Sequence, residues 1–584
     1  QFQLAKQSAE GSSAFARLSG RFPLCGRGDV NLYALFAEHF AKVINARGRS
    51  GVIVPTGIAT DDSTKFFFGW LAQENRLASL FDFENREAIF KSVHRSYKFC
   101  LLTIGSDIPL AKLTFFATQP HQLADARRCF SLTGEEFARI NPNTLTCPVF
   151  RSQKDAELTK KIYRAAPVLI RESSENSGEI NPWGIKFARL FDMSTDSDLF
   201  LNHEQSKTFP QGTLPLYEAK MVHHYDHRWA TYENDGETSR DCNLLEKQNP
   251  AYQSLPRYWV PENEVTLRTT KAPKAVLDAA KKNDELSLTD SLKQWLAGYL
   301  IETTGISSSK DLIEKLLGQT IQQTGGDLFS NDISPLCQQA QAMQQTYPLT
   351  GVEADQLATV LEKQHDLWSS LWPLLEARRP KYLLGWRDIC RATDERTVIA
   401  GVIPLCGVGN NMPVMLNNAG LDPQLWACLL GNLISLPFDF VARHKVGGTH
   451  LNFFIIKQLP VLGPTQYDKP AIDFIVPRVL ELTYTANDLQ PFAEDLGYHG
   501  DTFPFNPERR HQLKCELDAY YAKLYCLTRD EFRYIFDPTD VMGEDYPSET
   551  FRVLKNKELR EFDEFRTQRL VLEAWDKLEA GDLK

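Results

Sequence analysis

The order of hydrophobic patterns between residues 28 and 104 constrains the fold of this chain more than any other feature. A helical repeat, "GDVNLYALFAEHFAKVI" (28–44), precedes a short buried strand, "GRSGVIVPTGI" (48–58). A second helical stretch, "DDSTKFFFGWLAQENR" (61–76), leads to the strand-like "LASLFDFE" (77–84) and to an apolar run over 99–104. This order predicts the second half of a doubly wound α/β sheet. One face of the first helix gathers Leu32, Leu35, Phe36, Phe40, Val43 and Ile44, and Asp29 is placed to cap it.

The rest of the chain divides into a mixed region and a helical region. Residues 1–125 carry the α/β pattern, so we expect the back half of a Rossmann-like domain there. Residues 140–465 alternate short apolar segments with irregular stretches, which predicts a mixed α+β region with a Gln-rich helical insertion over 276–377. Residues 466–584 are predicted to be helical. The signals for this are the shared helix face of Leu513, Leu517, Tyr520, Tyr521 and Leu524 and a capping box of Thr528 with Glu531.

Composition excludes some classes of protein. The 584 residues are 42% hydrophobic and contain no run of 18 apolar residues, so we expect no membrane association. The formal charge of −10 argues against a general polyanion binder but allows a basic groove. The 11 cysteines form no CxxC pair, which favours reduced thiols in a cytoplasmic protein.

Motifs of several common enzyme classes are absent from the sequence. It contains no GxxxxGK[ST] phosphate loop, no GxSxG, no HExxH and no EF-hand loop. It also shows no cluster of the PD-(D/E)xK or HNH nuclease type. Nothing in the residues therefore indicates a hydrolase, a nucleotide-driven enzyme or a nuclease.

One loop in the α/β region has an unusual composition. Phe90 stands between two predicted strands, and Lys91, His94 and Arg95 follow it. An aromatic residue in a loop is often simple hairpin core. An aromatic residue among cations can instead stack on a nucleic-acid base.

Several stretches, in this order, resemble one family. "GDVNLYALFAEHF", "GRSGVIVPTGIATDDSTKFFF" and "AIFKSVHRSYKFCLLTI" are similar to the later helices, strands and β-hairpin of γ-class DNA adenine-N6 methyltransferases. "RHKVGGTHLNFFIIKQLPVLGP" resembles a strand and its exit in target-recognition domains. "YEAKMVHHYDHRWATY" and "EFRYIFDPTDVMGEDYPSETFRVLK" look typical of the fused methylases of type IIG restriction-modification and of phage-defence systems such as DISARM and BREX. The likeness is to the C-terminal portion of these enzymes.

The resemblance implies a cofactor, a substrate and roles for three residues. Asn31 and Phe36 would contact S-adenosylmethionine, and Phe90 would stack on an adenine flipped out of the duplex. Phe36 lies on the apolar helix face and would be core in most proteins, so its cofactor role rests on the resemblance alone. Residues 140–465 would be a target-recognition domain.

The same resemblance implies double-stranded DNA as the partner. His223, His224 and His227 with Asp226 also suggest a metal site, but we favour DNA-facing or packed side chains and expect no metal. Arg443, His444 and Lys445 are either phosphate contacts beside Gly447 or a solvated loop. The predicted DNA contacts are Lys91, His94, Arg95, Lys220, His223, His224, His227, Arg228, Arg391, Arg396, Arg443, His444, Lys445 and His450.

The sequence departs from the family at its catalytic motif. The Asn-Pro-Pro-aromatic tetrapeptide belongs upstream of Asn31, and "NPNT" at 141 and "NPWG" at 181 lack the second proline. We therefore expect the chain to be the later part of a longer polypeptide, or to need a catalytic portion from a partner chain, with other defence-system proteins as further partners. The alternative function is a DNA-specificity subunit that recognises DNA without catalysis.

Overall fold

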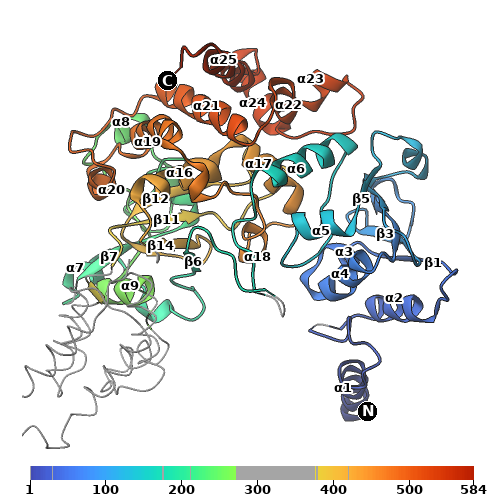
Figure 1. Ribbon diagram of the computed structural model, residues 1–584. Helices are drawn as coiled ribbons and strands as arrows, with labels where there is room; N and C mark the ends of the chain where they lie inside the picture. The colour runs from blue at the N-terminus through green and yellow to red at the C-terminus, as the bar shows by residue number, and fades with distance from the viewer. Residues whose placement is uncertain are drawn as a thin grey trace, which may run out of the picture.

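The computed structural model describes residues 2–28, 30–173, 177–210, 212–270, 272, 375–376, 379–417 and 420–583. The chain has a mixed α/β fold with several sheets and a helical C-terminal region (Figure 1). The Gln-rich block over 276–377, apart from residues 375 and 376, and the expected cap Asp29 lie outside the described residues.

A five-stranded sheet forms the N-terminal region. Strand β3 is antiparallel to both β1 and β2, and β2 is parallel to β4. Strands β1, β2 and β4 therefore point the same way. The strands expected within 48–58, 77–84 and 99–104 all lie in this sheet, the last two paired as a hairpin, so their prediction is confirmed. In sheet order the strands are β1 (Ser50–Pro55), β3 (Lys98–Ile104), β2 (Leu77–Glu84), β4 (Ala111–Ala117) and β5 (Phe130–Leu132).

Helices cover this sheet incompletely. Helices α3 (Gly57–Thr60) and α4 (Lys65–Gln73) are largely buried in the core that includes the sheet. The predicted buried strand β1 is instead an edge strand, and its Ile53 side chain is 59% exposed. Helix α1 (Phe2–Leu18) buries only Ala16.

Helix α2 (Leu32–Val43) forms where it is predicted, but it buries a different face. The buried side chains include Ala34, Leu35, Ala37 and Ala41. Small side chains allow a close approach to the sheet, and the larger apolar residues point outward. Leu32, Phe36, Phe40 and Val43 are exposed.

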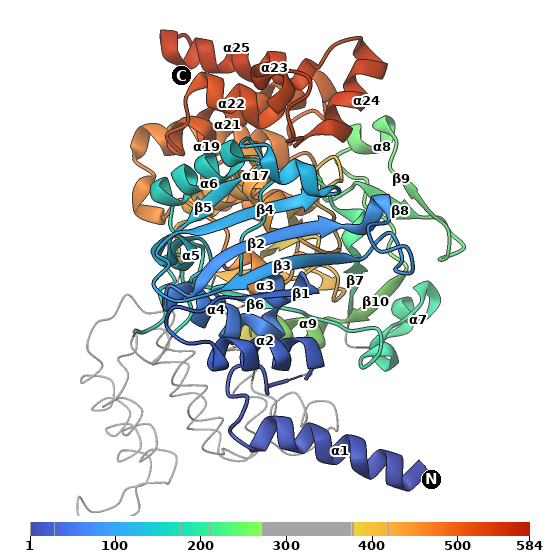
Figure 2. The same ribbon diagram turned by 90° about the vertical axis from the view of Figure 1, so that its right-hand side faces the viewer.

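Three smaller sheets make up the middle of the chain (Figure 2). Strand order is β10-β7-β13 in one, β12-β11-β14-β6 in the next and β8-β9 in the hairpin. The elements are β6 (Ile185–Ala188), α7 (His203–Thr208), β7 (Thr213–Tyr217), β8 (Ala230–Tyr232), β9 (Ser239–Asp241), α8 (Leu244–Gln248), β10 (Tyr258–Pro261), α9 (Glu262–Thr269), β11 (Tyr382–Trp386), β12 (Ala400–Pro404), β13 (Gly407–Val408) and β14 (Val414–Asn417).

Helices dominate from residue 423 onward, as predicted for residues 466–584 but not for 423–445, which belong to the predicted mixed α+β region. The Thr528–Glu531 capping box opens α22. The stretch "LNFFIIKQLPVL", expected to contain a strand, instead contains the short helix α18. The only strand-like pairings beside it among the described residues are isolated bridges at His450 and Pro460. The helices are α16 (Pro423–Ile434), α17 (Leu436–Lys445), α18 (Phe453–Ile456), α19 (Lys469–Thr483), α20 (Gln490–Asp495), α21 (Pro507–Leu524), α22 (Arg529–Phe536), α23 (Pro538–Met542), α24 (Arg552–Phe562) and α25 (Arg566–Ala580).

Among the described residues no single helix is long and apolar enough to cross a bilayer. Helices α16 and α17 pass that test only as a pair bent by 57°, by length and composition.

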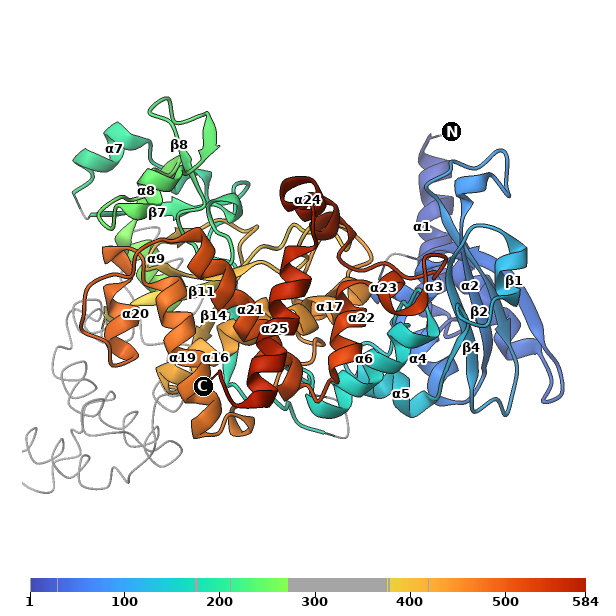
Figure 3. The same cartoon turned by 90° about the horizontal axis from the view of Figure 1, so that it is seen from above.

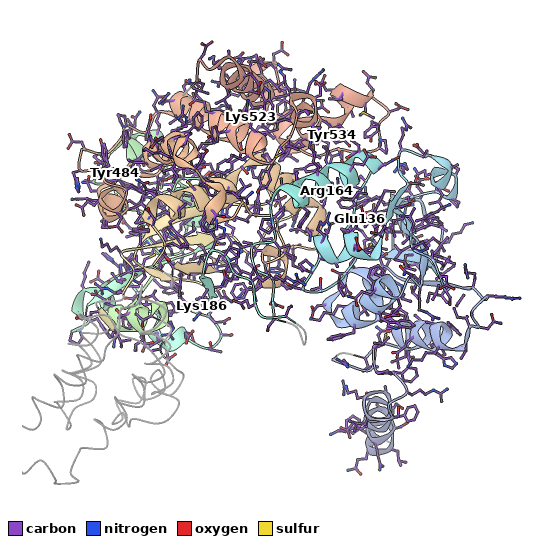
Figure 4. All side chains as sticks on the ribbon, in the orientation of Figure 1. Glu136, Arg164, Lys186, Tyr484, Lys523 and Tyr534 are labelled. Atoms are coloured by element: carbon purple, nitrogen blue, oxygen red, sulfur yellow. The ribbon has the colours of Figure 1, made fainter. Side chains whose placement is uncertain are left out.

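The N-terminal sheet and the helical region share one hydrophobic core. Helices α5 (Gly134–Ile140) and α6 (Gln153–Ala165) lie between them (Figures 1 and 4). The buried carboxylate of Asp155 on α6 accepts hydrogen bonds from Tyr534 at 2.8 Å and Ser548 at 2.7 Å. These hydrogen bonds join α6 to the C-terminal helical region.

Candidate nucleic-acid interface

The carboxyl ends of β1, β2 and β4 form one edge of the N-terminal sheet. Ligands of α/β sheets commonly bind at this edge. Asp82, near the end of β2, is 1% exposed and accepts hydrogen bonds from the Thr56 hydroxyl and from the Phe116 backbone N–H at 3.1 Å. Burial raises the pKa of Asp82 above its usual value. Asp82 thus links the ends of all three parallel strands.

At this edge the ring of Phe116, near the end of β4, contacts two cationic side chains. Its backbone φ is +59°, a left-handed conformation that non-glycine residues rarely adopt. The Lys98 ammonium lies 4.9 Å from its ring centroid and the Arg151 guanidinium lies 4.1 Å from it. Rare backbone conformations tend to mark functional sites, although packing can also impose them.

Asn85 organises the loop between β2 and β3. Its side chain is fully buried, donates hydrogen bonds to the carbonyls of Phe90 (3.0 Å) and Val93 (2.9 Å), and accepts one from the Phe90 N–H (2.9 Å). An amide can make these bonds because it carries both donors and an acceptor. The loop therefore has a defined conformation around one interior residue.

This loop presents Phe90 at its surface. The Phe90 ring is 38% exposed and packs edge-on against Phe99, with centroids 4.9 Å apart. Phe99 in turn stacks on Phe83 at 5.4 Å. Phe90 is thus held by one ring while part of its surface stays open, which is the geometry that a stacking platform needs.

The cations of the loop stay at the surface. Lys91, His94 and Arg95 are all exposed. Arg86 and Lys98 both approach Glu84, at 2.6 and 3.4 Å. Phe90 therefore sits in a locally basic surface.

The predicted cofactor residues are both exposed on α2. Asn31 precedes the helix and makes no side-chain cap, and the 55% exposed Phe36 stacks on Phe40 at 6.1 Å. These residues provide one aromatic wall and no enclosed pocket.

The stretch 220–228 lies mostly in the interior. Arg228 is 0% exposed, and its guanidinium donates to the carbonyls of Lys247, Asn249, Tyr252 and Thr485 at 2.7–3.3 Å. A side chain in this position does not reach a DNA surface, so the structure does not support the predicted DNA contact of Arg228. Lys220 is exposed and lies over the ring of Tyr232.

The rings of His223 and His224 lie 4.8 Å apart, but the three histidines of this stretch have different partners. His223 stacks on Trp229 at 4.2 Å, His224 hydrogen-bonds the Val398 carbonyl at 2.8 Å, and His227 contacts Asp488 at 2.9 Å. Burial lowers the pKa of His223 and of His224, which favours neutral rings. The structure places them as packed side chains rather than DNA contacts. Within the described ranges no group of three or more His, Cys, Asp or Glu residues could hold a metal ion.

The later predicted contacts are also largely internal. Arg443 donates to the carbonyls of Ala392, Asp394, Glu395 and Thr550, and Arg396 pairs with the buried Asp439 at 2.5 Å. The Lys445 ammonium donates to the carbonyl of Ile140 at 2.6 Å, and burial lowers its pKa well below the usual value.

The His444 Nδ1–H donates to the Phe440 carbonyl at 2.7 Å, and the ring packs on the rings of Phe150 and Phe440. Arg443, His444 and Lys445 are therefore neither a solvated loop nor a phosphate-binding one, because their polar atoms complete the packing around α17. Arg391 and His450 remain exposed.

Among the predicted residues, the structure thus brings together Phe90, Lys91, His94 and Arg95 at one surface. Sequence reasoning missed Asn85, Phe99 and Phe116 beside them. An Asn at a strand end is a recognisable turn signal, so Asn85 could have been found. The strained Phe116 had no signal in the sequence.

Comparisons with known proteins find similarity to solved structures alone. No family model matches the sequence, and no curated protein matches it. Among solved structures, the chain is similar to the type IIG restriction endonuclease BpuSI, with 12% identity and a TM-score of 0.26 over 84% of this chain and 51% of that one. It is also similar to the type IIL restriction-modification enzyme MmeI in complex with DNA, with 10% identity and a TM-score of 0.34 over 89% and 52%. The chain spans about half the length of each, and alignments this loose carry no argument about fold or function.

Proposed function

We propose that this chain is the C-terminal portion of a site-specific DNA adenine-N6 methyltransferase that uses S-adenosylmethionine in restriction-modification or phage defence. The observation that carries the proposal is the half-open Phe90 ring, fixed by Asn85 and Phe99 and surrounded by exposed cations.

The chemistry of such a reaction fits this surface. The amino group of adenine is unreachable inside a duplex, so the base must be flipped out, and an aromatic wall compensates for lost stacking by about 1–3 kcal/mol. Phe90 supplies that wall. Lys91, His94 and Arg95 hold the displaced phosphate backbone beside it.

A catalytic portion is needed to complete the site. The open edge of β1 and the apolar outer face of α2 are surfaces that a preceding βα unit would cover. The proposed occupant is the N-terminal catalytic portion of the same protein or a partner chain. Other proteins of a defence system remain further proposed partners.

S-adenosylmethionine would bind between this chain and the catalytic portion, with residues from both. Phe36 and Asn31 would hold one side of S-adenosylmethionine, whose methyl group is the one transferred. Both residues are exposed, so the other side of the binding site must come from the catalytic portion.

The proposal is tested by sequencing modified adenines in host DNA with the complete gene intact and with Phe90→Ala. We expect a specific methylated site that disappears in Phe90→Ala. Phe454→Ala, which removes a ring of similar exposure (39%), is the matched control and should leave the mark in place. A host in which the intact gene leaves no methylated adenine would contradict the methyltransferase and favour the specificity subunit.

A further inference from the structure

Helix α24 is a projecting helix with few buried side chains. Only Leu554 and Glu558 are buried among its 11 residues. Glu558 is turned inward, where its carboxylate accepts hydrogen bonds from the backbone N–H of Thr567 at 2.8 Å and from the Thr567 hydroxyl. One side of the helix is therefore anchored and the other is free.

The free side has a regular composition. Arg552, Asn556 and Arg560 are exposed at positions i, i+4 and i+8, so they lie along one face. Val553 and Leu559, each 41% exposed, flank this stripe. At about 1.5 Å per residue the helix is roughly 16 Å long.

The position of α24 relates it to the Phe90 loop. Strands β2 and β4 point toward the side of the molecule on which α24, α8, β8 and β9 lie (Figure 2). Seen from above, α24 lies between β8 and the N-terminal sheet on that side (Figure 3). A partner that contacts the Phe90 loop and extends toward β8 would pass α24.

We propose that α24 docks into a groove of duplex DNA with Arg552, Asn556 and Arg560 facing the nucleic acid. This inference rests on the proposed function, because it takes the same partner. A major groove admits an α-helix, and Arg and Asn are the side chains that pair with guanine and adenine edges. Val553 and Leu559 would contact thymine methyl groups.

Charge favours DNA over a protein partner. From Arg552 to Arg560 the exposed positions include two cations and one amide but no acidic residue, since Glu558 is buried. Lys555 and Lys557 are paired with Asp537 and Glu395, and Arg552 lies 3.4 Å from Glu549 in an exposed ion pair for which DNA would have to compete. Glu561 and Asp563 follow only at the C-terminal end.

The test uses the whole chain and random-sequence duplexes titrated at several salt concentrations. The variant R552A/N556A/R560A keeps good helix formers in α24, so its circular dichroism should match the wild type. On random-sequence DNA the two arginines would pair with phosphates rather than with a matching base, so we expect weaker binding and a log–log salt slope reduced by about 2, since each phosphate contact contributes about 0.9. R552K/R560K, which keeps both charges, should restore the slope.

The matched control removes two cations elsewhere. Arg164 on α6 and Lys577 near the end of α25 are both exposed, and α6 and the C-terminus lie on the opposite side from α24 (Figure 3). R164A/K577A should bind with the wild-type slope.

The outcomes separate the two proposals. If the α24 variant binds as the wild type while loss of Lys91 and Arg95 weakens binding, the α24 inference is wrong and the DNA partner stands. If the wild type itself binds no duplex, the proposed function fails with it. If the α24 variant keeps its DNA affinity but no longer associates with a protein of the same system, the helix is a protein-docking surface instead.

Discussion

Two cation-rich stretches of this chain end in opposite environments. The loop that carries Lys91 and Arg95 exposes its cations, whereas the stretch around Arg228 buries them. Both contain His, Arg and aromatic residues at close spacing. The difference lies in which side chain forms the hydrogen bonds that the nearby backbone N–H and C=O groups need.

In the Phe90 loop, the Asn85 side chain meets the backbone groups of Phe90 and Val93. The loop needs no cation for this, and its charged side chains point to solvent. Around Arg228, four carbonyls from distant segments converge, and a guanidinium carries enough donors to satisfy them. Local backbone satisfaction therefore decides which cations remain available to a ligand.

The largest expected effect is the loss of stability in Arg228→Ala. Removing this buried guanidinium leaves four carbonyls unsatisfied and should lower the free energy of unfolding by about 3–5 kcal/mol. Urea denaturation measures it. Arg95→Ala, an exposed counterpart, should stay within about 0.5 kcal/mol of the wild type. Equal losses of unfolding free energy in the two variants would show that the Arg228 stretch is no more structural than the Phe90 loop.

A second expected effect is pH-dependent. Burial alone would raise the pKa of Asp226, but the charges of Lys247 and Arg510 outweigh it and hold the pKa at about 2. Because the folded pKa lies below the unfolded value, this carboxylate stabilises the fold above about pH 4, and the contribution is lost as pH falls from about 4 to 2. It amounts to roughly 2 kcal/mol for a shift of this size.

Urea midpoints between pH 2 and 5 measure this effect. Asp226→Asn should lose part of the wild-type acid dependence in that window, although it is less stable at neutral pH because Lys247 loses its partner. A variant with an unchanged acid dependence would show that the Asp226–Lys247 pair does not govern it.

The sequence predicted some of this architecture well. The three N-terminal strands, α2, the helical C-terminal region and the Thr528 capping box follow from short-range periodicity and capping, which act within a few residues. The burial of Arg228 and Arg443 could not be predicted this way. Their acceptors come from segments up to 257 residues away in the chain. The outward turn of Phe36 likewise depends on which face of α2 meets the sheet.

A third prediction concerns the anchoring of Phe90. Asn85→Ala removes three hydrogen bonds to the loop, each of which contributes about 1 kcal/mol net. We expect faster amide hydrogen exchange at residues 88–95 and weaker binding of a duplex with a mismatched 2-aminopurine, read by its fluorescence. Asn85→Asp, which keeps the acceptor for Phe90 N–H, should lose less. An unaltered exchange rate in Asn85→Ala would show that Phe99 alone positions the ring.

The smallest expected effect concerns the exposed cations themselves. Lys91→Ala with Arg95→Ala removes two charges that make no internal ion pair among the described residues, so stability should stay within about 0.5 kcal/mol. If both contact phosphates, the log–log salt slope of duplex binding should fall by about 2, equally for all DNA sequences. Titrations with several unrelated duplexes at 50–300 mM salt measure this. The control is Arg164→Ala with Lys577→Ala, two exposed cations that are not predicted DNA contacts, and it should keep the wild-type slope. Arg391→Ala with Lys220→Ala removes two exposed cations of the middle region that are predicted DNA contacts. If this variant lowers the slope and the loop variant does not, the DNA-binding surface lies along the middle sheets. The exposed cations beside Phe90 would then be ordinary solvated charges. The Phe90 loop and the stretch around Arg228 would differ in burial, but neither would bind DNA.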